Sequence, residues 1–162
     1  MGMTTTTTAT DIPRAQWVRM LTAMPEADVV RLGEELAEPF TVAHKALPQA
    51  GLGLLRMEDG ALADSYFLGE IPVAMAWVEL RDAAGRVAEG AAQVMADSAE
   101  LAVALAVCDA ILANRLLGHE RVARQMEAGA ALRHDEDRRR RAMLLQTRVD
   151  FSLISVEGTN GD

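Results

Sequence analysis

The order of hydrophobic patterns along this 162-residue chain predicts an α+β fold. Helical spacing comes first, strand-like runs separated by turn residues occupy the middle, and two longer helical stretches follow. Strands gathered in one stretch and helices in others are typical of α+β domains. We therefore expect an N-terminal helical pair, an antiparallel sheet of four to five strands, two longer C-terminal helices and a terminal strand-like segment. Residues 13–156 are expected to form a single domain, between a disordered tail (1–12) and a flexible C-terminus (157–162).

Two short helices are expected at the start of the domain. One face of the first is apolar, and it comprises Trp17, Val18, Met20, Leu21 and Met24. The second begins at Pro25, since proline is tolerated in the first helical turn. Its apolar face comprises Val29, Val30, Leu32 and Leu36. The break between the helices is short, which favours an antiparallel pair.

The middle of the chain predicts the sheet. Strand-like runs cover residues 41–47, 51–57, 65–68 and 73–80, with turn signals at Pro48 and at residues 58–60. The run 73–80 is apolar at both alternating sets of positions. Residues 82–85 predict a hairpin loop that returns through 86–95. On this return strand Ala88, Gly90 and Ala92 form one flat face, which a helix backbone can approach closely.

Residues 97–117 predict a helix whose capping box joins Asp97 to Glu100. From residue 101 onwards apolar side chains cover nearly its whole circumference, so it must be buried on more than one side. Either it is a central helix between the sheet and the last helix, or a second protein covers one side. Gly118 ends it, and a final charged helix is expected from about 120 to 146.

Composition excludes several classes of protein. The formal net charge is -8, which disfavours binding to nucleic acid or to an anionic membrane surface. A single cysteine, Cys108, excludes an intrachain disulfide and fits a reducing compartment. The first ten residues contain a threonine run and no apolar core, and no apolar stretch has the length of a membrane span. We expect a cytoplasmic protein.

Candidate catalytic and ligand-binding residues are few. Gly51-Leu52-Gly53 is only a fragment of a phosphate-binding loop and lies in a strand-like run. His44, His119 and His134 do not share the spacing of metal ligands. Cys108 has the surroundings of a small buried hydrophobe rather than of a nucleophile. We therefore assign no catalytic, cofactor-binding or metal-binding residue.

Two charged features have alternative explanations. Asp109 lies inside the apolar helix, and a buried carboxylate needs a partner, either an arginine of this chain or a residue of another subunit. In the run 134–141, residues 135–137 are acidic and each has an arginine four residues later. This spacing favours an exposed, self-paired helical face. The alternative is contact of one or two arginines with a nucleotide phosphate or with a partner.

The segment after the last helix alternates in the manner of a strand. Arg148 and Asp150 point to one side of an extended chain, and Val149 and Phe151 to the other. The segment either completes the protein's own sheet or docks on another chain, with Phe151 as the buried anchor. We assign Thr147, Arg148, Val149, Asp150 and Phe151 as the candidate partner interface.

Four segments in this order resemble the G subunit of the bacterial carbon–phosphorus lyase core complex (PhnG). They are residues 14–21, Gly69-Glu70, residues 123–127 and residues 147–151, and the resemblance spans about 14 to 154. One departure lies at the end, where the family usually has a second aromatic, a threonine and then an Arg-Gly pair. This chain has Ser152, Leu153 and then Glu157-Gly158.

The resemblance implies a function in phosphonate use. In that family the G subunit works with the H, I and L proteins to displace adenine from MgATP with methylphosphonate, which gives α-D-ribose 1-methylphosphonate 5-triphosphate. It contacts the I subunit in a core that also contains H and J, and J performs the radical, iron–sulfur-dependent cleavage. The resemblance therefore implies an accessory subunit that binds no cofactor itself. A stand-alone enzyme and a phosphonate- or nucleotide-binding regulatory module are the alternatives.

Overall fold

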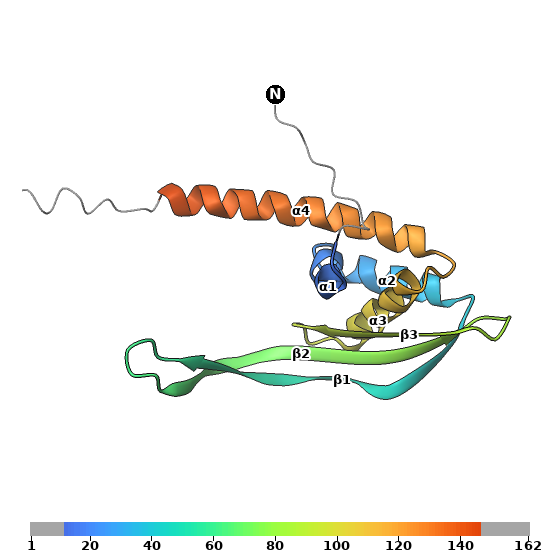
Figure 1. The fold of residues 1–162 in the computed structure, drawn as a ribbon, viewed down its shortest axis with the longest axis horizontal. Helices are drawn as coiled ribbons and strands as arrows, with labels where there is room; N and C mark the ends of the chain where they lie inside the picture. The colour runs from blue at the N-terminus through green and yellow to red at the C-terminus, as the bar shows by residue number, and fades with distance from the viewer. Residues whose placement is uncertain (1–11, 147–162) are drawn as a thin grey trace, which may run out of the picture.

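The computed structural model describes residues 12–146, which form helices on one face of a three-stranded antiparallel sheet (Figure 1). The α+β class is therefore confirmed. The elements in chain order are the 3-10 helix η2 (Arg14–Gln16), α1 (Trp17–Leu21), α2 (Glu26–Ala37), β1 (Thr41–Glu58), β2 (Ser65–Arg81), β3 (Val87–Val94), α3 (Ala99–Ala113) and α4 (His119–Gln146). The strand order is β1-β2-β3, so the strands follow one another as a meander.

The prediction of four to five strands was wrong, because two pairs of predicted strands are each one long strand. Pro48 lies inside β1, where the register moves from Ala46↔Trp77 to Gln49↔Met75. An edge strand tolerates a proline at such an irregularity because no ladder bond is lost there. On β2, Pro72 precedes Ala74, the first residue that pairs with β3, so β2 has a neighbour on one side only at this point.

The hairpin loop between β2 and β3 is confirmed. The Asp82 carboxylate accepts hydrogen bonds from the backbone N–H groups of Ala84 (3.0 Å) and Arg86 (2.9 Å), and from Nε of Arg86 (2.6 Å). These bonds hold the pKa of Asp82 below its usual range, with the Arg86 backbone N–H as the first cause. Gly85 has a φ of +82°, which glycine adopts without strain.

The two N-terminal helices are present, but each packs mainly on a later helix rather than on the other. α1 packs on α4, whereas α2 packs on α3. Pro25 is the N-cap of α2, one residue before its first turn. α2 packs on α3 because α3 is apolar around its whole circumference and offers a larger apolar surface than the five-residue α1 does.

α3 is the centre of the domain, as one of the two alternatives predicted. It contacts β2 and β3 on one side and α2, α1 and α4 on the others, and the residues from Ala104 to Ile111 are all buried. The small face of β3 permits this packing. A Cβ added at Gly90 would overlap the backbone of Ala106 and Ala110 on α3, so the prediction for this face is confirmed.

The ends of α3 differ from the prediction. Ser98, not Asp97, is the N-cap, and its hydroxyl oxygen accepts a hydrogen bond from the Leu101 N–H at 3.1 Å. Serine and aspartate at neighbouring positions are both good caps, and sequence alone does not separate them. The helix ends at Ala113 rather than at Leu117, and Arg115 follows with a φ of +49°.

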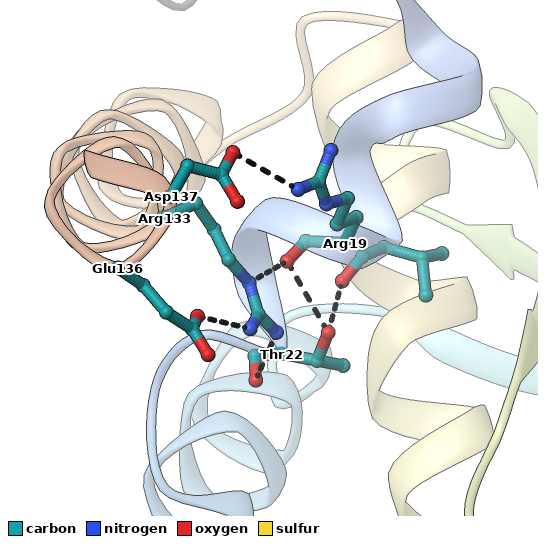
Figure 2. Close-up of polar contacts among 6 residues, drawn as sticks. Arg19, Thr22, Arg133, Glu136 and Asp137 are labelled. Atoms are coloured by element: carbon teal, nitrogen blue, oxygen red, sulfur yellow. Dashed lines mark hydrogen bonds and ion pairs between the residues drawn. The ribbon is translucent and has the colours of Figure 1, made fainter. Parts of the chain in front are cut away.

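A clamp of polar bonds joins α4 to α1 (Figure 2). Arg133 donates from Nε to the Arg19 carbonyl (3.2 Å) and from Nη2 to the Thr22 carbonyl (3.2 Å). Both acceptors lie at the C-terminal end of α1, where carbonyl groups lack helical partners and a cation is favoured. Arg133 also donates to Glu136 at 2.9 Å, which holds its guanidinium in place.

The acidic residues 135–137 of α4 are paired, but not with the arginines that were predicted. Asp135 pairs with Arg138 at 3.0 Å, Glu136 with Arg133 at 2.9 Å, and Asp137 with Arg19 of α1 at 3.4 Å. Residues three apart share a helix face as well as residues four apart, and the neighbouring helix supplies the third cation. No helix of the described residues is both long enough and apolar enough to span a membrane.

Candidate functional site

Asp109 is the buried charged residue of the described chain, and three donors hold its carboxylate. Arg14 donates from Nε to Oδ1 (2.8 Å) and from Nη2 to Oδ2 (2.6 Å), while the Ala91 N–H of β3 donates to Oδ2 (3.0 Å). The predicted partner, an arginine of this chain, is confirmed. These bonds raise the pKa of Arg14, first through hydrogen bonding to Asp109 and second through the attraction of its charge.

The Asp109 network links three elements that are distant in the sequence. Arg14 begins η2, Asp109 lies in α3 and Ala91 lies on the free edge of β3. The carboxylate thus satisfies a backbone N–H that a strand edge would otherwise leave unpaired. Both oxygens of Asp109 already accept hydrogen bonds from this chain. Asp109 therefore has the arrangement of a structural residue rather than of a general base, which needs a free oxygen to accept a proton from a substrate.

Cys108, the neighbour of Asp109, is completely buried. Burial, and second the nearby charge of Asp109, raises the pKa of its thiol to about 12. A thiol with such a pKa is almost entirely protonated at neutral pH, and the thiolate is the reactive form. Cys108 therefore packs as a small hydrophobe, as predicted.

The remaining candidate residues do not converge on one place. His44 lies on β1, His134 lies on α4, and Nδ1 of His119 is 3.0 Å from the Leu116 carbonyl oxygen. Within residues 12–146 no three His, Cys, Asp or Glu side chains are arranged to hold a metal ion. Gly51 and Gly53 lie inside β1, so they do not form a loop at a helix N-terminus, where a phosphate would bind.

Sequence reasoning missed a cluster of charged and aromatic residues on the sheet face away from the helices. Trp77 Nε1 donates to Glu89 Oε2 at 3.1 Å, and Lys45 Nζ lies 3.1 Å from Glu89 Oε1 and 5.8 Å from the centre of the Trp77 ring. Glu89, first by its hydrogen bond and then by its charge, raises the pKa of Lys45. The alternation of Trp77 and Glu79 along β2 was the available signal, but the partners come from two other strands.

The largest exposed feature is the distal part of the β1–β2 hairpin, residues 47–73, which we call the hairpin arm. It extends past α1, α2 and α3 and past the end of β3, whereas α4 runs in the same direction over much of its length (Figure 1). Nine of the eighteen large exposed hydrophobic residues of the described chain lie on it. They are Leu47, Leu52, Leu54, Leu55, Met57, Leu62, Tyr66, Phe67 and Leu68. An apolar surface of this kind typically marks a protein interface.

The predicted partner interface, Thr147 to Phe151, lies outside the described residues and stays a prediction. The exposure of the hairpin arm was also not foreseen from sequence. The run 73–80, whose sequence is apolar on both faces, has Ala74, Val78 and Leu80 fully buried beneath the helices. Only its other face, with Met75 (46% exposed) and Trp77 (45%), remains open.

Comparison with protein families identifies the chain. The family model described as phosphonate metabolism protein PhnG matches residues 12–156. This chain belongs to the PhnG family. Its process is therefore phosphonate metabolism. A search of curated proteins gave no match.

The family assignment directs attention to the three described segments that carry the resemblance. The segment 14–21 contains Arg14, which holds Asp109. Residues 123–127 contain Met126, which is completely buried on α4. Gly69-Glu70 lies on the hairpin arm, where both residues are exposed. Two of the three segments therefore stabilise the fold, and the third lies on the exposed apolar surface.

Proposed function

We propose that this chain is an accessory subunit of the phosphonate-degrading carbon–phosphorus lyase complex. It helps to transfer methylphosphonate onto ATP with release of adenine, giving α-D-ribose 1-methylphosphonate 5-triphosphate. MgATP is a substrate of the complex, and no cofactor belongs to this chain. Its partners are the I, H, J and L subunits in the cytoplasm, with direct contact to I, which carries the nucleosidase chemistry.

The match to the PhnG family over residues 12–156 is the observation that carries this proposal. The geometry supports an accessory role. The two buried side chains that could in principle react have structural roles. Asp109 accepts hydrogen bonds, and Cys108 packs in the core as a protonated thiol. The hairpin arm, by contrast, offers the apolar area that a subunit of an assembly buries.

Reconstitution of the reaction tests the proposal. The purified chain is combined with the I, H and L subunits, MgATP and methylphosphonate, and both adenine and the phosphonate ester are measured. We expect the ester to form only in the mixture that contains this chain, and we expect the chain alone to release no adenine. Ester formation of equal rate without the chain would contradict an accessory role.

Two further outcomes separate the alternatives. Adenine release by the pure chain, abolished by a point mutation within it, would establish a stand-alone enzyme. Saturable binding of methylphosphonate or ATP to the isolated chain, at one site per molecule, would establish a small-molecule-binding module instead.

A further inference from the structure

The sheet face that α2 and α3 cover continues onto the hairpin arm, where these two helices no longer cover it. Ala74 of β2 is completely buried and pairs with Ala50 of β1. Alternation along β1 puts Leu52 and Leu54 on that same face. Both are nevertheless exposed, at 68% and 61%, because α2 and α3 do not reach this far along the hairpin (Figure 1).

The opposite face of the arm is apolar as well. Ile71 and Val73 alternate with Ala74 on β2, so they lie on the outer face, in line with Met75 and Trp77. The arm is thus a two-stranded ribbon with hydrophobic residues on both faces. Such a ribbon has little stability alone in water, because it buries too little of its apolar surface. Its 27 residues, 47–73, match the 20–30 residues that each side of a stable protein interface contributes.

The charge of the arm indicates what kind of protein covers it. Its ionisable residues are one base, Arg56, and four acids, so its net charge is -3 (1 - 4). The acids are Glu58, Asp59, Asp64 and Glu70. The structure shows no ion pair for any of the five with another residue of 12–146. A second copy would bring an equal negative arm and a chain of net charge -8, so like charges would repel across the contact.

Building on the proposed function, in which the chain acts within a complex, we propose that the hairpin arm is its docking element for a different protein subunit. That subunit presents an apolar surface bordered by lysines or arginines. Over Leu52 and Leu54 it continues the layer that α2 and α3 supply over the rest of that face. The unpaired acids of the arm, Glu58 and Glu70 among them, meet its basic border.

Matched variants of the full-length chain test this docking mode with the purified I subunit as the probe. Leu52→Asp and Leu54→Asp introduce a charge at the arm, and Leu117→Asp introduces the same charge between α3 and α4, at a residue of similar exposure (72%). We expect each arm variant to raise the dissociation constant at least about tenfold, as the loss of a central anchor does. Leu117→Asp should change it less than about twofold, and Glu70→Lys should raise it about threefold or more, because it opposes a basic border.

Thermal unfolding of each free variant is the control, and we expect a Tm close to that of the wild type because the arm residues lie outside the core. Arm variants that bind as the wild type does, or an equal loss for Leu117→Asp, would overturn the docking mode while leaving the proposed function standing. A wild-type chain that binds none of the I, H, J and L subunits would refute the proposed function itself. A homodimer in sedimentation that Leu54→Asp dissociates would show that a second copy occupies the arm, and this would also overturn the inference.

Discussion

Removal of the Asp109 carboxylate should destabilise the domain mainly through a backbone group, not through the lost ion pair. In Asp109→Ala the Ala91 N–H loses its acceptor. Because Ala91 is exposed on an edge strand and the bond is only partly buried, the cost lies near the lower end of the roughly 1–3 kcal/mol of an unsatisfied buried donor. The Arg14 side chain is 58% exposed, so water replaces its bonds, and an exposed pair contributes only about 0–1 kcal/mol. We expect a loss of about 1.5 kcal/mol in the free energy of unfolding, or roughly 3–6 °C in Tm for a domain of this size.

Two matched variants separate the contributions. Asp109→Asn keeps an oxygen for the Ala91 N–H but sets an amide N–H against a donor of Arg14, so we expect a loss of about 1 kcal/mol. Arg14→Ala leaves the carboxylate, in a residue only 8% exposed, without a cation. Breaking a fully buried pair costs about 3–5 kcal/mol. The Ala91 bond and the water admitted beside Asp109 reduce this to about 1–2 kcal/mol.

Urea and thermal unfolding, followed by far-UV circular dichroism, measure these losses for the wild type, the single variants and the Arg14→Ala/Asp109→Ala double variant. The double variant should lose less than the sum of the two single losses, because the two residues act on one network. Since the pKa of Arg14 is raised, its stabilisation is present below the pKa of an unfolded arginine and is lost only as pH rises through the folded pKa. The effect of Arg14→Ala should therefore stay constant across neutral pH. Asp109→Asn as costly as Asp109→Ala would refute the role given to the Ala91 N–H.

Four further predictions follow from particular contacts. Gly90→Ala should cost about 3 kcal/mol, because the added methyl overlaps the α3 backbone, and a denaturation midpoint equal to that of the wild type would contradict this packing. The Cys108 thiol, with its pKa near 12, should react with a thiol reagent only as fast as the chain unfolds, and rapid labelling of the native protein would show that it is accessible. The lowered pKa of Asp82 contributes stability that is present above the pKa of an unfolded aspartate and is lost as pH falls through the folded pKa. In Arg86→Ala an NMR titration should show only a partial rise of this pKa, because the backbone N–H at position 86, the first cause of the shift, remains. Phe151→Ala should weaken assembly with the I subunit by about 2–4 kcal/mol without lowering the Tm of the free chain, and the reverse pattern would mean that the segment belongs to the chain's own sheet.

Much of the architecture was readable from sequence because its signals are local. The hairpin loop at 82–85 follows from Asp82 and Gly85, whose side-chain and backbone preferences act within a few residues. The buried position of α3 follows from apolar residues around its whole circumference. The close approach at Gly90 follows from small side chains that alternate along one strand.

The extent of the strands was not readable because it depends on neighbours. Pro48 is a turn signal in isolation, yet β1 passes through it because an edge strand keeps one side free. The same reasoning applies to the capping of α3, where Asp97 and Ser98 are equivalent candidates and only the path of the chain selects Ser98.

The sequence by itself determined the α+β class, the identity of the helices, the need of Asp109 for a cation and the membership of the PhnG family. Only the tertiary structure decided that this cation is Arg14, 95 residues away, that α1 packs on α4, and that the helices leave the hairpin arm uncovered. The physical reason is that periodicity reports which face of an element is apolar, whereas the partner of that face is set by contacts between distant segments. An exposed Leu54 and a buried Val78 therefore show the same pattern in sequence, and the length of the helices laid across the sheet makes the difference.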